Sequence, residues 1–95
     1  MDIKKITKKL KALSNPNRFE LFVEIAKRSQ SSYEEEECFV SNIMIKLSIS
    51  APTVSHHLKE LENADLITTE RNGKFLVAKI NKEALKELQG VVELG

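Results

Sequence analysis

The sequence at residues 48–64 is SISAPTVSHHLKELENA, and this stretch decides the fold. Residues 48–50 form a tight connection in which Ser50 is a good N-cap, and Pro52 then fits the first turn of a helix. The helix is expected to run to about Ala64, because one stripe of it follows the helical period. The members of that stripe are Val54, His57, Leu58 and Leu61.

The segments on either side of this helix complete a recognisable pattern. Before it, Ser41 is expected to cap a short helix that contains Ile43, Met44 and Leu47. After it, two strand-like runs, 66–71 and 74–80, flank Asn72-Gly73, the strongest short-range signal for a tight hairpin. A short helix, a three-residue turn, a longer helix and a hairpin together predict a helix-turn-helix with a wing.

Further helices are expected towards both ends of the chain. A first amphipathic helix covers residues 2–13, and a second starts at a Ser14 or Asn15 cap and runs to about Arg28. Its expected buried side is Phe19, Phe22, Val23 and Ala26, widened by Leu21 and Ile25. Residues 29–36 are expected to be an exposed loop, and a last helix is capped by Asn81 and ended by Gly90.

These elements predict a mainly α fold with a β-hairpin wing (α+β), in the order α-α-α-α-β-β-α. The 95 residues suit one domain, 1–95, and a core this small would gain from a partner subunit. Residues 2–5 have no apolar segment of a secretory signal, so we expect a cytoplasmic protein. No Gly-rich phosphate loop, nucleophile with its base or set of metal ligands is evident, which disfavours an enzyme.

The charge is unevenly distributed although its net value is only +1. Residues 1–30 carry eight basic and three acidic side chains, whereas residues 31–45 carry four acids and no base. Binding to phosphates needs positive charge on one face and not over the whole chain. The lysines of residues 2–13 could add long-range attraction to a nucleic acid, but we expect them mainly to keep an exposed helix soluble. We expect Glu34–Glu37 to be solvated and distant from any nucleic acid.

Four motifs resemble the arsenic-repressor (ArsR/SmtB) family of winged helix-turn-helix transcriptional regulators. Residues 13–18 resemble the family's entry to its second helix, and residues 50–61 resemble its recognition helix, whose core is Val-Ser-x-His-Leu-x-x-Leu. Residues 64–67 resemble the exit from that helix, and residues 71–74 resemble the tip of the wing. The likeness covers about residues 10–81.

The resemblance implies a homodimeric repressor that binds an imperfect palindrome in double-stranded DNA. The expected DNA contacts from the recognition helix are Ser50, Thr53, Ser55, His56, His57 and Lys59, and those from the wing are Arg71, Asn72 and Lys74. We expect His57 to be partly buried and hydrogen-bonded. The terminal helices, 2–13 and 81–89, would form the dimer surface through Ile3, Ile6, Leu10, Leu85, Leu88 and Val91.

Two departures from the family pattern have consequences. Asp65 replaces the family's usual glycine at a position that needs a left-handed backbone. Phe39 and Ser41 occupy the positions of the thiolates in the family's metal site, and residues 81–95 contain neither Asp nor His. We therefore expect no metal cofactor and place the chain in the non-metal-sensing branch. The neighbouring carboxylates should raise the pKa of the Cys38 thiol and lower its reactivity.

Two other functions remain open on the sequence alone. A winged helix that binds a protein and not DNA is compatible with the net charge of +1 and with Glu60 and Glu62 on the recognition helix. A metal-responsive repressor with an unfamiliar site is the second alternative.

Overall fold

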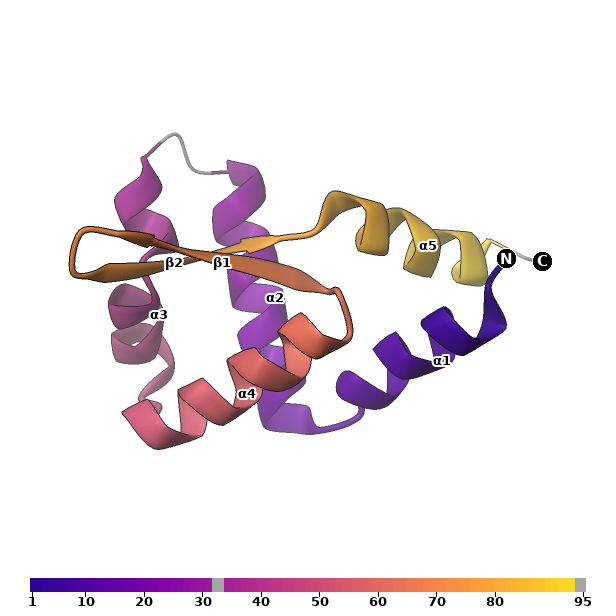
Figure 1. Ribbon diagram of the computed structural model, residues 1–95, viewed down its shortest axis with the longest axis horizontal. Helices are drawn as coiled ribbons and strands as arrows, with labels where there is room; N and C mark the ends of the chain where they lie inside the picture. Colours follow the sequence, from indigo (N-terminus) through magenta and orange to yellow (C-terminus); the bar gives the residue numbers. More distant parts are fainter. Residues whose placement is uncertain (32–33, 94–95) are drawn as a thin grey trace.

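The computed structural model describes residues 1–31 and 34–93, and within them it has the predicted winged helix-turn-helix order (Figure 1). The helices are α1 (Ile3–Ala12), α2 (Pro16–Ser31), α3 (Val40–Leu47), α4 (Ala51–Asn63) and α5 (Lys82–Val92). A 3₁₀ turn, η1 (Glu35–Cys38), precedes α3, and strands β1 (Ile67–Asn72) and β2 (Phe75–Ile80) pair antiparallel between α4 and α5. The fold class predicted from the sequence is confirmed.

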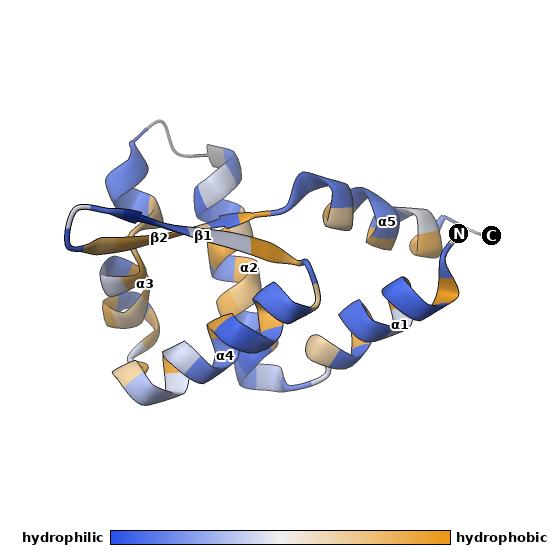
Figure 2. Ribbon diagram, in the orientation of Figure 1, coloured by the Kyte–Doolittle hydropathy of each residue, from blue (hydrophilic) through white to orange (hydrophobic). Residues whose placement is uncertain are grey.

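The core lies between α2, α3, α4 and the hairpin, and Figure 2 shows the apolar residues of these elements turned towards one another. The largest fully buried side chains are Leu21, Ile25, Ile43, Leu61, Leu66 and Val77. Helix α2 is rotated relative to the prediction: Phe19 is 47% exposed, and Leu21, Phe22 and Ile25 form its buried centre. The predicted buried residues and those that widen the apolar face both have helical spacing, so the packing of α2 against β2, α3 and α4 decides which of them are buried.

Several element boundaries differ from the predicted ones. Asn15 caps α2, because its side-chain oxygen accepts hydrogen bonds from the backbone N–H groups of Asn17 and Arg18. Helix α2 continues to Ser31, so the predicted loop of residues 29–36 is shorter at both ends, although residues 32–33 of it lie outside the described residues.

Helix α3 begins one residue earlier than its predicted cap, and Ser41 is not that cap. Phe39 occupies the N-cap position with an extended backbone, and it forms an isolated antiparallel bridge with Val77. Its ring also stacks on Phe75, with the centroids 4.5 Å apart. These contacts with β2 hold Phe39 out of the helix, which therefore starts at Val40 and leaves Ser41 exposed in its first turn.

The hairpin turn is displaced by one residue from the predicted Asn72-Gly73. Asn72 pairs with Phe75 across the ladder, so the two central residues are Gly73 and Lys74. Gly73 has a φ of +62°, whereas Lys74 is not among the described residues with a positive φ. A positive φ at the first central residue alone is the signature of a type II′ turn. Asp65 has a φ of +60°, as its place in the sequence predicted.

Helices α1 and α5 extend together from the body of the molecule, which measures 42 × 27 × 19 Å (Figure 1). Asn81 caps α5 as predicted, but Gly90 does not end it, and the helix continues to Val92. Lys9, which belonged to the expected solvent face of α1, is only 3% exposed and its Nζ lies 3.5 Å from Glu87 Oε2. No helix of the described residues is both long enough and apolar enough to span a membrane.

Candidate nucleic-acid interface

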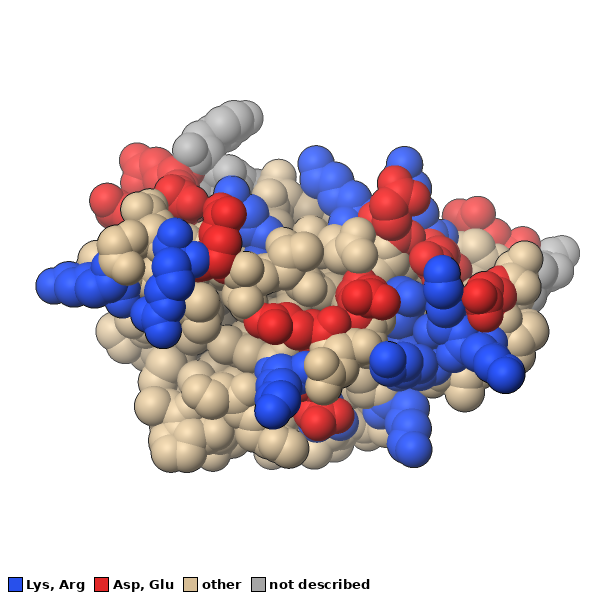
Figure 3. Space-filling view, viewed as in Figure 1, with Lys and Arg blue, Asp and Glu red and all other residues tan. Residues whose placement is uncertain are grey.

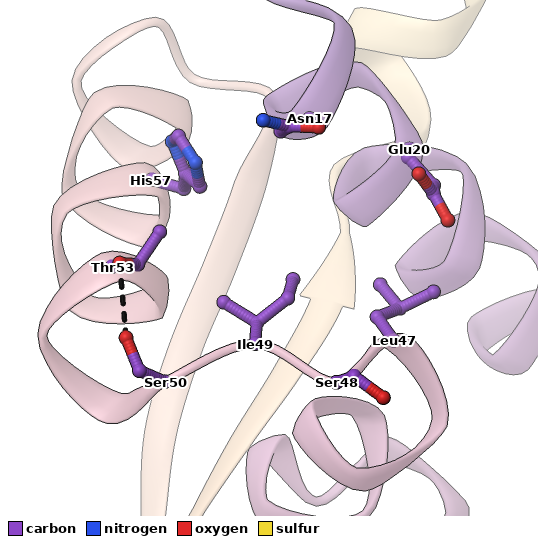
Figure 4. A pocket seen from close by; sticks show the side chains of 8 residues that line it. All are labelled: Asn17, Glu20, Leu47, Ser48, Ile49, Ser50, Thr53 and His57. Atoms are coloured by element: carbon purple, nitrogen blue, oxygen red, sulfur yellow. Dashed lines mark hydrogen bonds between the residues drawn. The ribbon is translucent and has the colours of Figure 1, made fainter.

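Helix α4 starts with the expected Ser50 and Pro52, but Ser50 does not cap it through its side chain. The Ser50 hydroxyl instead donates a hydrogen bond to Thr53 Oγ1 at 3.0 Å (Figure 4). This bond orders the first turn of α4 at the point where the chain leaves the 48–50 connection. Ser48 takes a left-handed conformation there, with a φ of +55°, and its N–H bonds the end of α3.

The buried stripe of α4 is the one that the sequence predicted, because Val54, His57, Leu58 and Leu61 are all buried. At about 100° per residue, the side opposite this stripe carries His56, Lys59 and Asn63, all exposed. Thr53 and Ser55 are also exposed, one on each flank of this line. We call His56, Lys59 and Asn63 the outward line of α4. The predicted contacts did not include Asn63, although its spacing from Lys59 could have found it.

The two acids of α4 lie beside the outward line and not on it. Glu60 is half-buried on the flank that faces α1, where it lines a hollow with Lys8 and Arg18. Glu62 lies on the other flank, and its carboxylate accepts a hydrogen bond from the Thr69 hydroxyl of β1. Neither carboxylate therefore lies among the side chains of the outward line of α4, which a nucleic acid would contact.

His57 is buried under α4 and does not reach the outward line. It is 6% exposed, and its Nδ1 has no hydrogen-bond partner among the described residues, so the predicted hydrogen bond is missing at that atom. Burial lowers the pKa of His57, and the positive charge of Arg18 and the neighbouring His56 lower it further. The ring borders a hollow of about 400 Å³ between α4, the 48–50 connection and Asn17 of α2 (Figure 4).

The wing places Arg71, Asn72 and Lys74 at an exposed tip, as predicted. Asn72 is engaged within the subunit, because its Nδ2 donates a hydrogen bond to Glu35 Oε2 at 2.8 Å. The acidic run was expected far from the nucleic-acid surface, yet this bond joins it to the wing, and Figure 3 shows acidic side chains near basic ones at that end of the molecule. Within the described residues, the charged groups of Arg71 and Lys74 at this tip form no ion pair.

The base of the wing is braced by aromatic contacts. Phe75 stacks on Phe39, and the Lys74 Nζ lies 5.4 Å from the centroid of the Phe75 ring. Asn42 Nδ2 donates to the Glu36 carbonyl oxygen, so η1 is bonded to α3 as well as to the wing. These bonds fix the wing relative to the helix-turn-helix.

Cys38 is buried below this region, and its thiol pKa is raised as predicted but for a different main reason. Burial raises the pKa most, Lys79 and Arg28 oppose it, and Glu37 and Glu35 add smaller increases. In the part of the chain that the structure describes, no three His, Cys, Asp or Glu side chains are grouped so that they could hold a metal ion.

The residues predicted for a dimer surface are only partly available. Ile3 and Leu10 of α1 are 67% and 48% exposed, whereas Ile6 is buried within the subunit. Leu85, Leu88 and Val91 of α5 are half-buried. Val92, next to them, is exposed and was not predicted. Helices α1 and α5 thus present an apolar surface. Ile6 does not belong to it, because its side chain is buried within the subunit.

Comparison with known proteins agrees with this geometry. The family model described as "Bacterial regulatory protein, arsR family" matches residues 31–69. The arsenical resistance operon repressor of Staphylococcus xylosus is 31% identical over 85 residues, which are 90% of this chain and 74% of that protein. The HTH-type transcriptional regulator YuzN of Bacillus subtilis (strain 168) is 34% identical over 80 residues, 82% of this chain and 84% of its own length.

A solved structure shares the fold. The homodimeric winged helix-turn-helix DNA-binding domain of Mb0332 from Mycobacterium bovis superposes with a TM-score of 0.71 at 22% identity, over 95% of this chain and 79% of that one. The identity to the two bacterial regulators, over most of their lengths, is high enough to establish kinship. The chain belongs to the ArsR family of winged helix-turn-helix DNA-binding transcriptional regulators.

Proposed function

We propose that this chain is a cytoplasmic, homodimeric repressor that binds an imperfect palindrome in promoter DNA. The observation that carries the proposal is the outward line of α4, which stays exposed and polar while the opposite stripe is buried in the core. The wing follows directly and presents Arg71 and Lys74 beyond it. The similarity to an arsenical resistance operon repressor supports repression as the outcome of binding.

The residues of this interface divide into two roles. His56, with Ser55 and Thr53 on its flanks, lies near the N-terminal half of α4, the part of a recognition helix that meets base edges in the major groove. Lys59 and the wing residues Arg71 and Lys74 suit phosphates, which position the protein without reading sequence. His57 supports this helix from below, and Asn72 holds the wing through Glu35.

The homodimer would form through the apolar residues of α1 and α5, of which Ile3, Leu10 and Val92 are exposed and Leu85, Leu88 and Val91 are half-buried. A two-fold axis there would place two copies of α4 about 34–36 Å apart, one turn of DNA. The Mb0332 domain, which has this fold, is homodimeric. All residues of the chain, 1–95, would then act as one DNA-binding domain with two dimerising terminal helices.

We further propose that regulation does not use the family's thiolate metal site and that the chain has no catalytic role. Phe39 packs on Phe75 where a thiolate ligand would stand, and Ser41 offers only a hydroxyl. The relatives of this chain are transcriptional regulators, which supports the absence of a catalytic role.

The test of this function is selection from a random duplex pool, followed by fluorescence anisotropy on the selected duplex and on a scrambled one. We expect a palindromic sequence to be enriched. Ser55→Ala and His56→Ala should each reduce the preference for it by about 1–3 kcal/mol. Lys74→Ala should weaken binding to both duplexes alike and reduce the slope of log affinity against log salt concentration by about 1.

Gln30→Ala is the control for these variants, since it alters an exposed polar side chain at the far end of α2. A protein that enriches no sequence and binds both duplexes equally would contradict the proposed function and favour the protein-binding alternative. A preserved sequence preference in Ser55→Ala and His56→Ala would show that another face of the protein meets the bases.

A further inference from the structure

Helix α1 carries two exposed stripes of different chemistry. Residues 3, 7 and 10 form a stripe with Ile3 and Leu10, and residues 4, 8 and 11 form a neighbouring stripe that consists of lysines alone. We propose that Lys4, Lys8 and Lys11, the basic stripe, bind the phosphate backbone of DNA and extend the interface of α4. This inference rests on the proposed function, because it assumes that α4 contacts DNA.

The basic stripe is continuous with the end of α4. A hollow of about 290 Å³ lies between the two helices, and Lys8, Lys11 and Arg18 line it together with Asn63, the last residue of the outward line. In Figure 3, blue side chains gather over the region of α1, and a red side chain lies between them and the blue one over α4. A duplex lying along the outward line would therefore meet these lysines as it left the helix.

The three lysines have no ion-pair partner among the described residues. The ion pairs Lys9–Glu87, Arg28–Glu24 and Lys86–Glu83 involve other basic residues. Lys9 differs from its neighbours because it is buried against α5 and its charge is compensated within the subunit. Glu60 is the carboxylate of the hollow, so one negative charge faces the positive charges of Lys8, Lys11 and Arg18 there.

Solubility alone does not account for this placement. Lys5 is also exposed, on the side of α1 next to Glu87 and Gly90, but the exposed stripe of residues 3, 7 and 10 carries no charge. The charges of α1 are therefore not spread over its whole exposed surface, as they would be if they only kept the helix in solution. If Ile3 and Leu10 contact a partner subunit, the basic stripe of each copy lies beside the two-fold axis. It would then face the DNA backbone between the two half-sites, where neither α4 nor the wing reaches.

The test compares two triple variants of equal charge. Lys4→Gln/Lys8→Gln/Lys11→Gln removes the basic stripe, and Lys79→Gln/Lys82→Gln/Lys86→Gln removes three exposed lysines of β2 and α5. Binding to a random-sequence duplex of about 30 base pairs is measured at several salt concentrations. Each lysine–phosphate contact that is lost lowers the slope of log affinity against log salt concentration by roughly 0.9. The first variant should therefore show a slope smaller by at least about 2 per dimer and bind at least tenfold more weakly at low salt.

The slope of the control variant should change much less, because its lysines lie away from the α1–α4 hollow. A Lys→Arg triple at positions 4, 8 and 11 should restore binding, and circular dichroism should show all variants folded. Equal slopes for the two Gln triples would overturn the inference while leaving the proposed function intact. A wild-type protein that binds no duplex would overturn both.

Discussion

The buried side chain of His57 links the recognition helix to the core, and Arg18 affects its charge state. The Arg18 Nε donates a hydrogen bond to the Ala12 carbonyl oxygen, which fixes the guanidinium between α1 and α2. The burial of His57 and the charge of Arg18 both disfavour a protonated imidazole and so lower its pKa. The centroid of its ring lies 5.9 Å from that of His56, and the ring borders the same hollow as Thr53 in the first turn of α4.

The pH dependence of stability follows from the lowered pKa of His57. The unfolded chain takes up a proton near the ordinary histidine pKa of about 6.5, whereas the folded chain does so only at lower pH. The stabilisation is therefore complete above about pH 6.5 and is lost as the pH falls towards the folded pKa. Urea unfolding at a series of pH values should show wild type losing stability over this window relative to His57→Gln. Parallel curves for the two proteins would contradict this account.

At the scale of elements, the two described glycines have opposite roles that the sequence pattern did not separate. Gly73 has a positive φ at the hairpin turn, whereas Gly90 lies inside α5, and in both cases an added Cβ would have no heavy atom within 4 Å. Backbone conformation alone therefore decides the effect of a methyl group at each position.

Gly73→Ala should destabilise the protein by about 1 kcal/mol, because alanine is strained at positive φ. Gly90→Ala should stabilise it by about 0.5–1 kcal/mol, because glycine weakens a helix interior. Urea unfolding of both variants at one protein concentration measures the two changes. A loss of stability in Gly90→Ala would mean that the helix ends at this residue, as the sequence pattern had suggested.

At the scale of the whole molecule, the subunit leaves apolar surface uncovered where α1 and α5 run together. Lys9 and Glu87 join the two helices, and Ile6 is buried close to Glu87 and Gly90. The helices thus form one unit within the subunit before any partner arrives. Ile3 and Leu10 of α1 remain exposed outside it, as does Val92 at the end of α5.

Association should therefore depend on Leu10 and not on every exposed apolar residue. Leu10→Glu is expected to raise the dimer dissociation constant by at least about tenfold, since burying a leucine contributes roughly 1.5–3 kcal/mol. Ile45→Glu is the matched control, because Ile45 of α3 is more exposed than Leu10 but lies on the body of the molecule. Sedimentation velocity without DNA measures both, and equal dimerisation of Leu10→Glu and wild type would exclude α1 from the interface.

The sequence by itself determined the order of the elements and the face of α4 that is buried. Those properties depend on neighbours along the chain: helical spacing in residues 54–61, the cap Asn81, and the need for left-handed backbone at Asp65. The cap of α2 was narrowed to Ser14 or Asn15, and the structure shows that it is Asn15. Ser55 and His56 could be assigned to the exposed surface on the same grounds. The family motif then supplied a function for that surface.

Only the tertiary structure decided which residues are free to act. Lys9 and Lys8 are adjacent lysines, yet one is buried against Glu87 and the other is exposed beside α4. Asn72 is held by Glu35, thirty-seven residues away, and Phe39 leaves α3 because it meets Phe75. Contacts of this kind join residues that are far apart in the chain, and the spacing of residue types within one segment carries no information about them.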